Sequence, residues 1–199
     1  MLNDGDLIIK NRSFKDGANP TQYIASVNDM KAVAQGDSVI VRSDITCRIN
    51  EDNHIHAVCT FIINKLGVLH IAYSLTPVMQ TNYLPIIGMA VNYPEEVKVK
   101  RWLGLGPGDT YPNKKAGALL GVWDDSCLSG THAARWVEMG CGKSIARISR
   151  CGYMDWNEET PSEIRILSQV LGRSEKGRLN DETYRVYPHR TYQGAFTID

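Results

Sequence analysis

The chain has no excess of charge of either sign: its 199 residues include 22 lysines and arginines against 22 aspartates and glutamates. It also has no dense basic block, so composition disfavours nucleic acid and an anionic membrane surface as main partners. No apolar run approaches the roughly 18 residues of a membrane span. The amino terminus lacks the basic region and apolar core of a signal peptide, so we predict none and leave the compartment open.

Motifs for metals and cofactors are equally scarce. The five cysteines are odd in number, and no two of them have the C-x-x-C spacing of a zinc or redox site. Residues 140–144 contain a Gly-Lys-Ser tripeptide but lack the upstream glycine of a phosphate-binding loop. His54 and His56 could hold an ion only with a third ligand, and two exposed histidines beside a turn is the favoured interpretation. We therefore predict no metal site and no cofactor, and expect Cys47 and Cys59 to be buried thiols in strands.

What the chain does contain is a series of extended, β-branched segments separated by short polar turns. These features predict an all-β antiparallel sandwich with at most one or two short helices, in which residues 1–199 form a single domain. Between 68 and 77, the odd-numbered apolar side chains define the core face. A helix is expected over 161–171, because Pro161 suits a first turn and Gly172 a carboxyl cap. Strands are expected at 7–10, 23–27, 38–49, 56–63, 68–77, 86–93, 97–102, 134–139, 144–149, 184–187 and 194–198, with residues 116–123 either a strand or a helical turn.

Groups that could catalyse hydrolysis do not converge in this pattern. Glycoside cleavage commonly needs two carboxylates about 5–10 Å apart. The pairs Asp124-Asp125 and Glu158-Glu159 are sequence neighbours, which point to opposite faces of a strand. They are better explained as solvated loop charges, so we expect no catalytic residue in the chain.

The central segment from Trp102 to Pro112 carries the most distinctive chemistry. A predicted strand ends there in three glycines and two prolines, which bend the backbone sharply. Trp102 and Tyr111 flank the bend, and an aromatic surface rimmed by polar groups suits the C–H face and hydroxyls of a sugar. A loop whose tryptophan fills the core explains the same residues and is favoured on composition alone.

The same segment resembles a family signature. Trp102-Leu-Gly-Leu-Gly-Pro107, followed by Tyr111-Pro112, is similar to the W-x-G-x-G-P-x-E-x-Y-x-D-R motif in the carboxyl-terminal domain of glycoside hydrolase family 2 β-galactosidases. The resemblance covers roughly residues 19–150. It implies an antiparallel supersandwich shared with galactose mutarotases, following a catalytic (β/α)8 barrel that carries both catalytic glutamates. The chain is then expected to be a non-catalytic domain excised from a larger enzyme.

The chain departs from that signature at three charged or polar positions. Asp109 stands where the family has Glu, Asn113 where it has Asp, and Lys114 where it has Arg. Lysine cannot reproduce the bidentate fork of arginine, so we expect a family salt bridge here to be altered or lost. Some members also present a tryptophan to the substrate from the loop matching 140–144, which has no aromatic residue in this chain.

These observations give a set of candidate carbohydrate contacts and partners. Alternating arginine and aromatic residues around 135–136 can line a saccharide groove, although structural arginine–carboxylate pairs explain them equally well. The resemblance implies a galactoside-type carbohydrate and the parent's barrel as partners. The candidate carbohydrate-binding residues are Tyr111, Trp102, Trp136, Arg135 and Asp109.

Two other functions stay open at this point. One is an autonomous carbohydrate-binding module that uses the aromatic side chains just named. The other is a mutarotase-like aldose epimerase, which needs a histidine and a carboxylate converging over a sugar ring. His70 and His132 are its first candidates.

Overall fold

The protein is an all-β molecule whose strands pair antiparallel throughout the part that can be described. The computed structural model describes residues 7–8, 23–80, 83–84, 86–93, 97–124, 130–141, 143–156, 162–170 and 185–199. Within these ranges every regular element is a strand, which confirms the predicted fold class. None of these residues forms a helix long and apolar enough to cross a membrane. The strands are β1 (Leu7–Ile8), β2 (Ile24–Gln35), β3 (Ser38–Arg48), β4 (His54–Asn64), β5 (Leu69–Val78), β6 (Ile86–Asn92), β7 (Val97–Gly106), β8 (Leu119–Asp124), β9 (Gly130–Cys141), β10 (Ser144–Trp156), β11 (Glu163–Val170) and β12 (Tyr192–Ile198).

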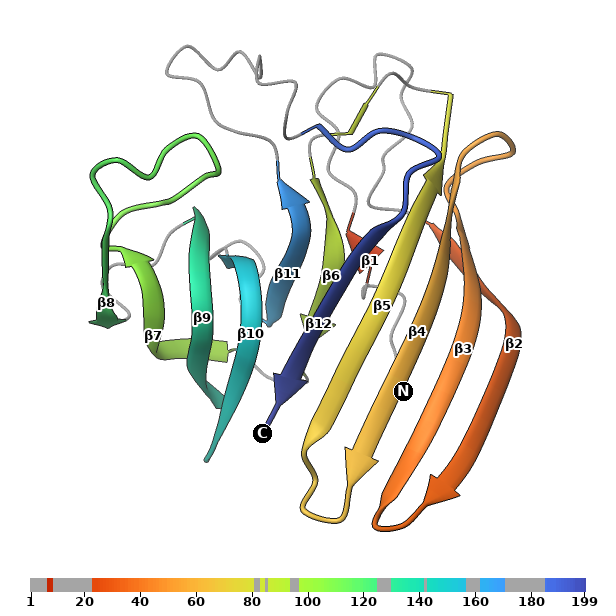
Figure 1. The fold of residues 1–199 in the computed structure, drawn as a ribbon, viewed down its shortest axis with the longest axis horizontal. Helices are drawn as coiled ribbons and strands as arrows, with labels where there is room; N and C mark the ends of the chain where they lie inside the picture. Colours follow the sequence, from red (N-terminus) through yellow and green to blue (C-terminus); the bar gives the residue numbers. More distant parts are fainter. Residues whose placement is uncertain are drawn as a thin grey trace.

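The strands form one curled sheet. Its main order is β1-β6-β11-β10-β12-β5-β4-β3-β2, while β9 joins β10 to β7 and β7 carries β8 at its far edge. Figure 1 shows the long strands β2 to β5 side by side at one end and β7 to β10 at the other. The inner face of this sheet encloses one main hydrophobic cluster, to which strands from both ends contribute. Curling of the sheet therefore supplies a sandwich-like core.

Side-chain alternation places the core as the sequence predicted. On β5 the side chains of Ile71, Tyr73 and Leu75 are buried, with exposed fractions of 3%, 5% and 0%. Successive residues of a strand point to opposite faces, so these three share the inner face. Cys47 and Cys59 are each 2% exposed on the same face of neighbouring strands, which confirms their predicted burial.

The predicted turns between the long strands are also present. Gly36, with a φ of +57°, lies in the turn that joins β2 to β3. Between β4 and β5, the side-chain oxygen of Asn64 accepts hydrogen bonds from the backbone N–H groups of Leu66 and Val68 at 2.9 and 3.0 Å. Gly67 completes that turn with a φ of +81°, which glycine adopts at no steric cost. Local turn chemistry therefore sets the register of these hairpins.

The helix predicted over 161–171 is wrong. The segment Glu163–Val170 is β11, which lies between β10 and β6 and pairs with both. Ile164, Arg165, Ile166 and Leu167 are all buried, so the strand is covered on both faces, as expected of an interior strand. Pairing on two sides outweighed the local signals for helix ends, which fall outside the described residues.

The strand predicted over 184–187 is also wrong. Within the described part of this segment, the backbone makes a single bridge, in which Val186 and Leu84 exchange hydrogen bonds of 2.8 and 3.0 Å. The later prediction at 194–198 is confirmed by β12, which begins two residues earlier. The strand β12 therefore pairs with β5 on one side and with β10 on the other, and joins these two parts of the sheet.

Candidate functional site

The corner that follows β7 is built on a fully buried tryptophan. The Trp102 side chain is 0% exposed, and its ring centre lies 4.6 Å from that of His132 and 6.4 Å from that of Trp123. Trp102 pairs across the ladder with Trp123 of β8 and with Val137 of β9. This side chain fills the core, so it presents no surface to a ligand in this structure.

Beyond Trp102, backbone and side-chain hydrogen bonds fix the corner to the start of β9. The N–H of Thr110 donates to the carbonyl of Thr131 at 2.7 Å. The hydroxyl oxygen of Thr110, which is 1% exposed, accepts from the N–H of Ala133 at 2.8 Å. The indole N–H of Trp123 donates to the Gly104 carbonyl at 3.1 Å. The glycine- and proline-rich bend is therefore an ordered structural element rather than a loose loop.

The charged pair of the corner is altered but not lost. The Lys114 Nζ lies 2.8 Å from Asp109 Oδ1, so a shorter acid and a lysine still meet where the resembling family has Glu and Arg. Tyr111 forms an isolated bridge with Lys114 and packs partly buried against a small cluster that includes Ile86 and Leu167. Asp109 and Tyr111 therefore both contact Lys114 within the turn.

A groove of about 540 Å³ opens beside this corner. Small residues and the cross-strand pair Leu105 and Leu120 line it, and Arg135 is the charged one among the described lining residues. The residues lining it are Gly104, Leu105, Leu120, Ala133, Ala134, Arg135 and Gly152. Two residues of the signature segment thus lie at a concave surface of a size that suits a small ligand.

Two β-bulges meet at the groove. In the β7–β9 ladder, Trp136 pairs with Leu103 and Ala134 with Gly104, so Arg135 is skipped. In the β9–β10 ladder, Trp136 pairs with Ser149 and Ala134 with Gly152, so Arg135 is skipped again. Bulges of this kind re-aim a side chain and are frequent beside binding sites. Here they leave the Arg135 side chain exposed at the groove.

Trp136 belongs to a separate cluster on the outer face of β7, β9 and β10. Its ring lies under the guanidinium carbons of Arg147 and Arg101, at 4.9 and 6.0 Å from the ring centre. Both arginines also donate to the carboxylate of Glu138, including a contact of 3.2 Å from Arg147 Nε to Oε1. Two cations stacked on the indole and tied to an acid occupy the surface that a sugar would need.

The Glu138 carboxylate should make stability depend on pH. The hydrogen bonds from Arg101 and then Arg147 lower the pKa of Glu138 from 4.5 to about 2. Because the folded pKa lies below the ordinary value, the stabilisation is complete above about pH 4.5 and is lost as pH falls towards 2. In Glu138→Gln, the unfolding temperature should be lower at pH 7, and the difference from the parent protein should vanish near pH 2. A constant difference at every pH, followed by circular dichroism, would contradict this assignment.

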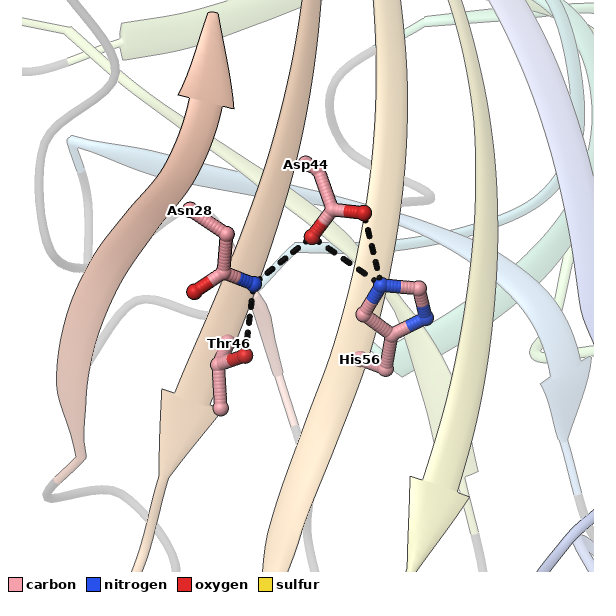
Figure 2. A network of polar contacts seen from close by, with 4 residues as sticks. All are labelled: Asn28, Asp44, Thr46 and His56. Carbon is pink, nitrogen blue, oxygen red and sulfur yellow. Dashed lines mark hydrogen bonds and ion pairs between the residues drawn. The ribbon is translucent and has the colours of Figure 1, made fainter.

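A polar network lies on the outer face at the other end of the sheet, where β2 is the edge strand. Figure 2 shows Asn28, Asp44, Thr46 and His56, which come from three neighbouring strands. Asn28 Nδ2 donates to Asp44 Oδ1 at 2.7 Å and to Thr46 Oγ1 at 2.9 Å, while His56 Nε2 lies 3.0 Å from both Asp44 oxygens. The hydrogen bonds from Asn28 and His56 lower the pKa of Asp44. The network ties the exposed edge strand to its neighbours.

The five candidate carbohydrate contacts therefore do not share one site. Arg135 alone lines the groove, Trp102 lies beneath the corner, and Trp136 is covered by arginines. Asp109 and Tyr111 belong to the turn. Sequence reasoning missed Leu120 and Gly152 as groove residues, because neither the pairing of β8 with β7 nor the register shift before Gly152 leaves a mark in a hydrophobic pattern.

The histidines have mixed surroundings. His132 is fully buried in contact with Trp102, and His70 Nδ1 lies 2.8 Å from the hydroxyl of Thr197. His56, for which the sequence favoured an exposed position beside a turn over a metal site, lies against the carboxylate of Asp44. Across the described ranges, no three His, Cys, Asp or Glu side chains gather closely enough to hold a metal ion.

The curled antiparallel sheet, with its tryptophan-based corner and adjoining groove, defines an all-β protein with a sandwich-like core. Residues 3–134 match a family model described as β-galactosidase small chain, and the chain belongs to this family. A β-galactosidase from Lactobacillus delbrueckii subsp. bulgaricus is 24% identical over 116 residues, which are 58% of this chain and 11% of that enzyme. The chain thus corresponds to a small part of its relative.

Proposed function

We propose that this chain is the carboxyl-terminal, non-catalytic β-sandwich domain of a β-galactosidase-like family 2 glycoside hydrolase. In this role residues 1–199 form one domain that packs on the catalytic barrel of its parent and walls one side of the sugar pocket. The observation that carries the proposal is the extent of the match, since the related segment makes up 11% of a β-galactosidase. The remainder of such an enzyme supplies ample chain for a separate catalytic barrel.

The state of the acidic side chains supports a non-catalytic role. Glycoside hydrolysis needs one carboxylic acid that can donate a proton and a second carboxylate on the other side of the bond. Glu138 is held ionised by two arginines, and Arg165 binds both Asp155 and Glu163, at 3.2 and 2.5 Å. The lowered pKa of Glu138 makes this carboxylate a poor proton donor at neutral pH. The acids in these clusters therefore serve structure.

An activity assay tests this proposal directly. The purified chain is incubated with a chromogenic β-galactoside, and the L. delbrueckii β-galactosidase at equal molar concentration serves as the positive control. We expect no release of chromophore above the buffer blank, because Glu138, Asp155 and Glu163 are engaged in ion pairs with arginine and do not form the pair of free acids that hydrolysis needs. Sustained turnover by the isolated chain that survives repeated purification would overturn the non-catalytic role.

A second experiment tests whether the chain packs on the catalytic barrel. The barrel-containing remainder of the parent enzyme is produced with and without this chain, and complex formation is followed by size-exclusion chromatography with light scattering. We expect a one-to-one complex with a higher kcat/KM than the remainder alone, since the domain completes one wall of the pocket. Separate elution at micromolar concentration, with unchanged activity, would contradict the packing role.

A further inference from the structure

We propose that the groove beside the corner binds an anionic saccharide, namely a pyranose that carries a carboxylate. Arg135 is the group that binds this carboxylate and so favours the acid over a neutral sugar. This inference rests on the proposed carbohydrate role and names the class of ligand for one surface of the domain. It concerns the groove of about 540 Å³ lined by residues of β7, β8, β9 and β10. That volume lies in the range of small-molecule sites and accommodates one or two sugar rings.

The position of Arg135 is the first support. Both ladders of β9 skip this residue while the residues on either side of it are paired. In the β7–β9 ladder Arg135 is the extra residue, and in the β9–β10 ladder it lies opposite the two unpaired residues 150 and 151 of β10. Its side chain is exposed, and no described residue forms an ion pair with its guanidinium group. Arg101 and Arg147, on the neighbouring strands, differ in that each is committed to Glu138. The register shifts thus place at a concave surface a cation that none of the described residues pairs with.

The chemistry of the lining decides which ligand suits the groove. Apart from Arg135, the described residues that line it are glycine, alanine and leucine, whose side chains neither donate nor accept hydrogen bonds. A neutral sugar needs both donors and acceptors for its hydroxyls, whereas guanidinium has five N–H donors and no acceptor. A carboxylate needs donors only, and arginine binds it through two parallel hydrogen bonds. The lining therefore favours an acid over its neutral counterpart.

The walls of the groove suit the remaining part of a sugar acid. Leu105 and Leu120 face each other across the β7–β8 ladder, and Leu120 is 56% exposed. Ala133 and Ala134 contribute only methyl groups to the lining, so the C–H face of a pyranose ring can lie against apolar atoms. Gly152, with a φ of +71°, has no atom within 4 Å of the place where a Cβ would lie, so it keeps the far side open.

Isothermal titration calorimetry of the full chain with digalacturonate tests the proposal. Galactobiose, a disaccharide without the carboxylates, is the neutral control. We expect the acid to bind about tenfold or more tightly than the neutral disaccharide, because a charge-assisted bidentate contact distinguishes them. Arg135→Gln should remove the preference, and Arg135→Lys should retain part of it. Arg42→Gln, which changes an exposed arginine on β3, is the matched control and should bind like the parent protein.

A second variant and a second ligand make the outcome decisive. Leu120→Glu should abolish binding, since it places a competing carboxylate in the groove that Arg135 also lines. Acetate should bind far more weakly than digalacturonate, because it makes no contact with the apolar walls. Absence of heat with digalacturonate at millimolar concentration, equal binding of galactobiose, or equal binding of acetate each overturns the inference. Any of these results leaves the galactoside assay unaffected, so the two proposals fail separately.

Discussion

Replacing Trp102 with alanine is expected to lower the free energy of unfolding by about 3–5 kcal/mol, the range observed when a buried tryptophan is truncated. The side chain is 0% exposed and contacts the rings of Trp123 and His132. Its removal leaves a cavity beneath the corner, and the fixed strands on either side cannot collapse to fill it. A loss of this size is a large part of the stability of a typical domain.

Urea denaturation followed by circular dichroism measures this effect, and Trp136→Ala is the matched control. Trp136 is a tryptophan on the neighbouring strand, but it lies on the outer face under two arginines and is only partly buried. Its truncation should cost clearly less than that of Trp102. If Trp102→Ala does not fold, Trp102→Phe should still show a measurable loss. Equal effects of the two alanine variants would contradict the central packing role of Trp102.

Much of the fold could be predicted because it follows from period-two alternation and turn chemistry. The segment containing Ile71, Tyr73 and Leu75 has apolar residues at every second position, so one face had to be buried. The pattern failed at β11, where both faces are buried and the apolar residues Ile164, Ile166, Leu167 and Val170 do not alternate strictly. A short segment of this kind suits a strand and a helix equally, and only its two neighbouring strands decide between them.

The candidate site could be predicted only in part. The corner was located from its glycines, prolines and aromatics, and the sequence already favoured a core position for Trp102. The sequence left open whether the salt bridge at Asp109 and Lys114 is altered or lost, because the outcome depends on how closely the turn brings the two side chains together. The exposure of Arg135 depends on two register shifts in separate ladders, which single-sequence patterns do not encode.

Replacing Gly104 with alanine is expected to destabilise the corner by about 1–3 kcal/mol or more through overpacking. A Cβ atom at this position would lie 2.3 Å from the carbonyl oxygen of Ala133, 2.8 Å from the Trp102 ring and 2.9 Å from the Ala134 Cα. Two of these neighbours are backbone atoms of the paired strand, which cannot turn aside as a flexible side chain would. The strands β7 and β9 would have to separate at the point where they line the groove.

Gly108 and Gly117 are the controls for this prediction, because no atom lies within 4 Å of a Cβ at either position and neither requires a positive φ. Alanine there should change the free energy of unfolding by no more than about 0.5 kcal/mol. Thermal unfolding of all three variants separates a steric effect at Gly104 from a general loss of backbone freedom. An unfolding temperature of Gly104→Ala within error of the two controls would mean that the β7–β9 spacing is set by something other than the missing side chain. The groove that depends on this spacing would then owe its shape to the bulges at Arg135 alone.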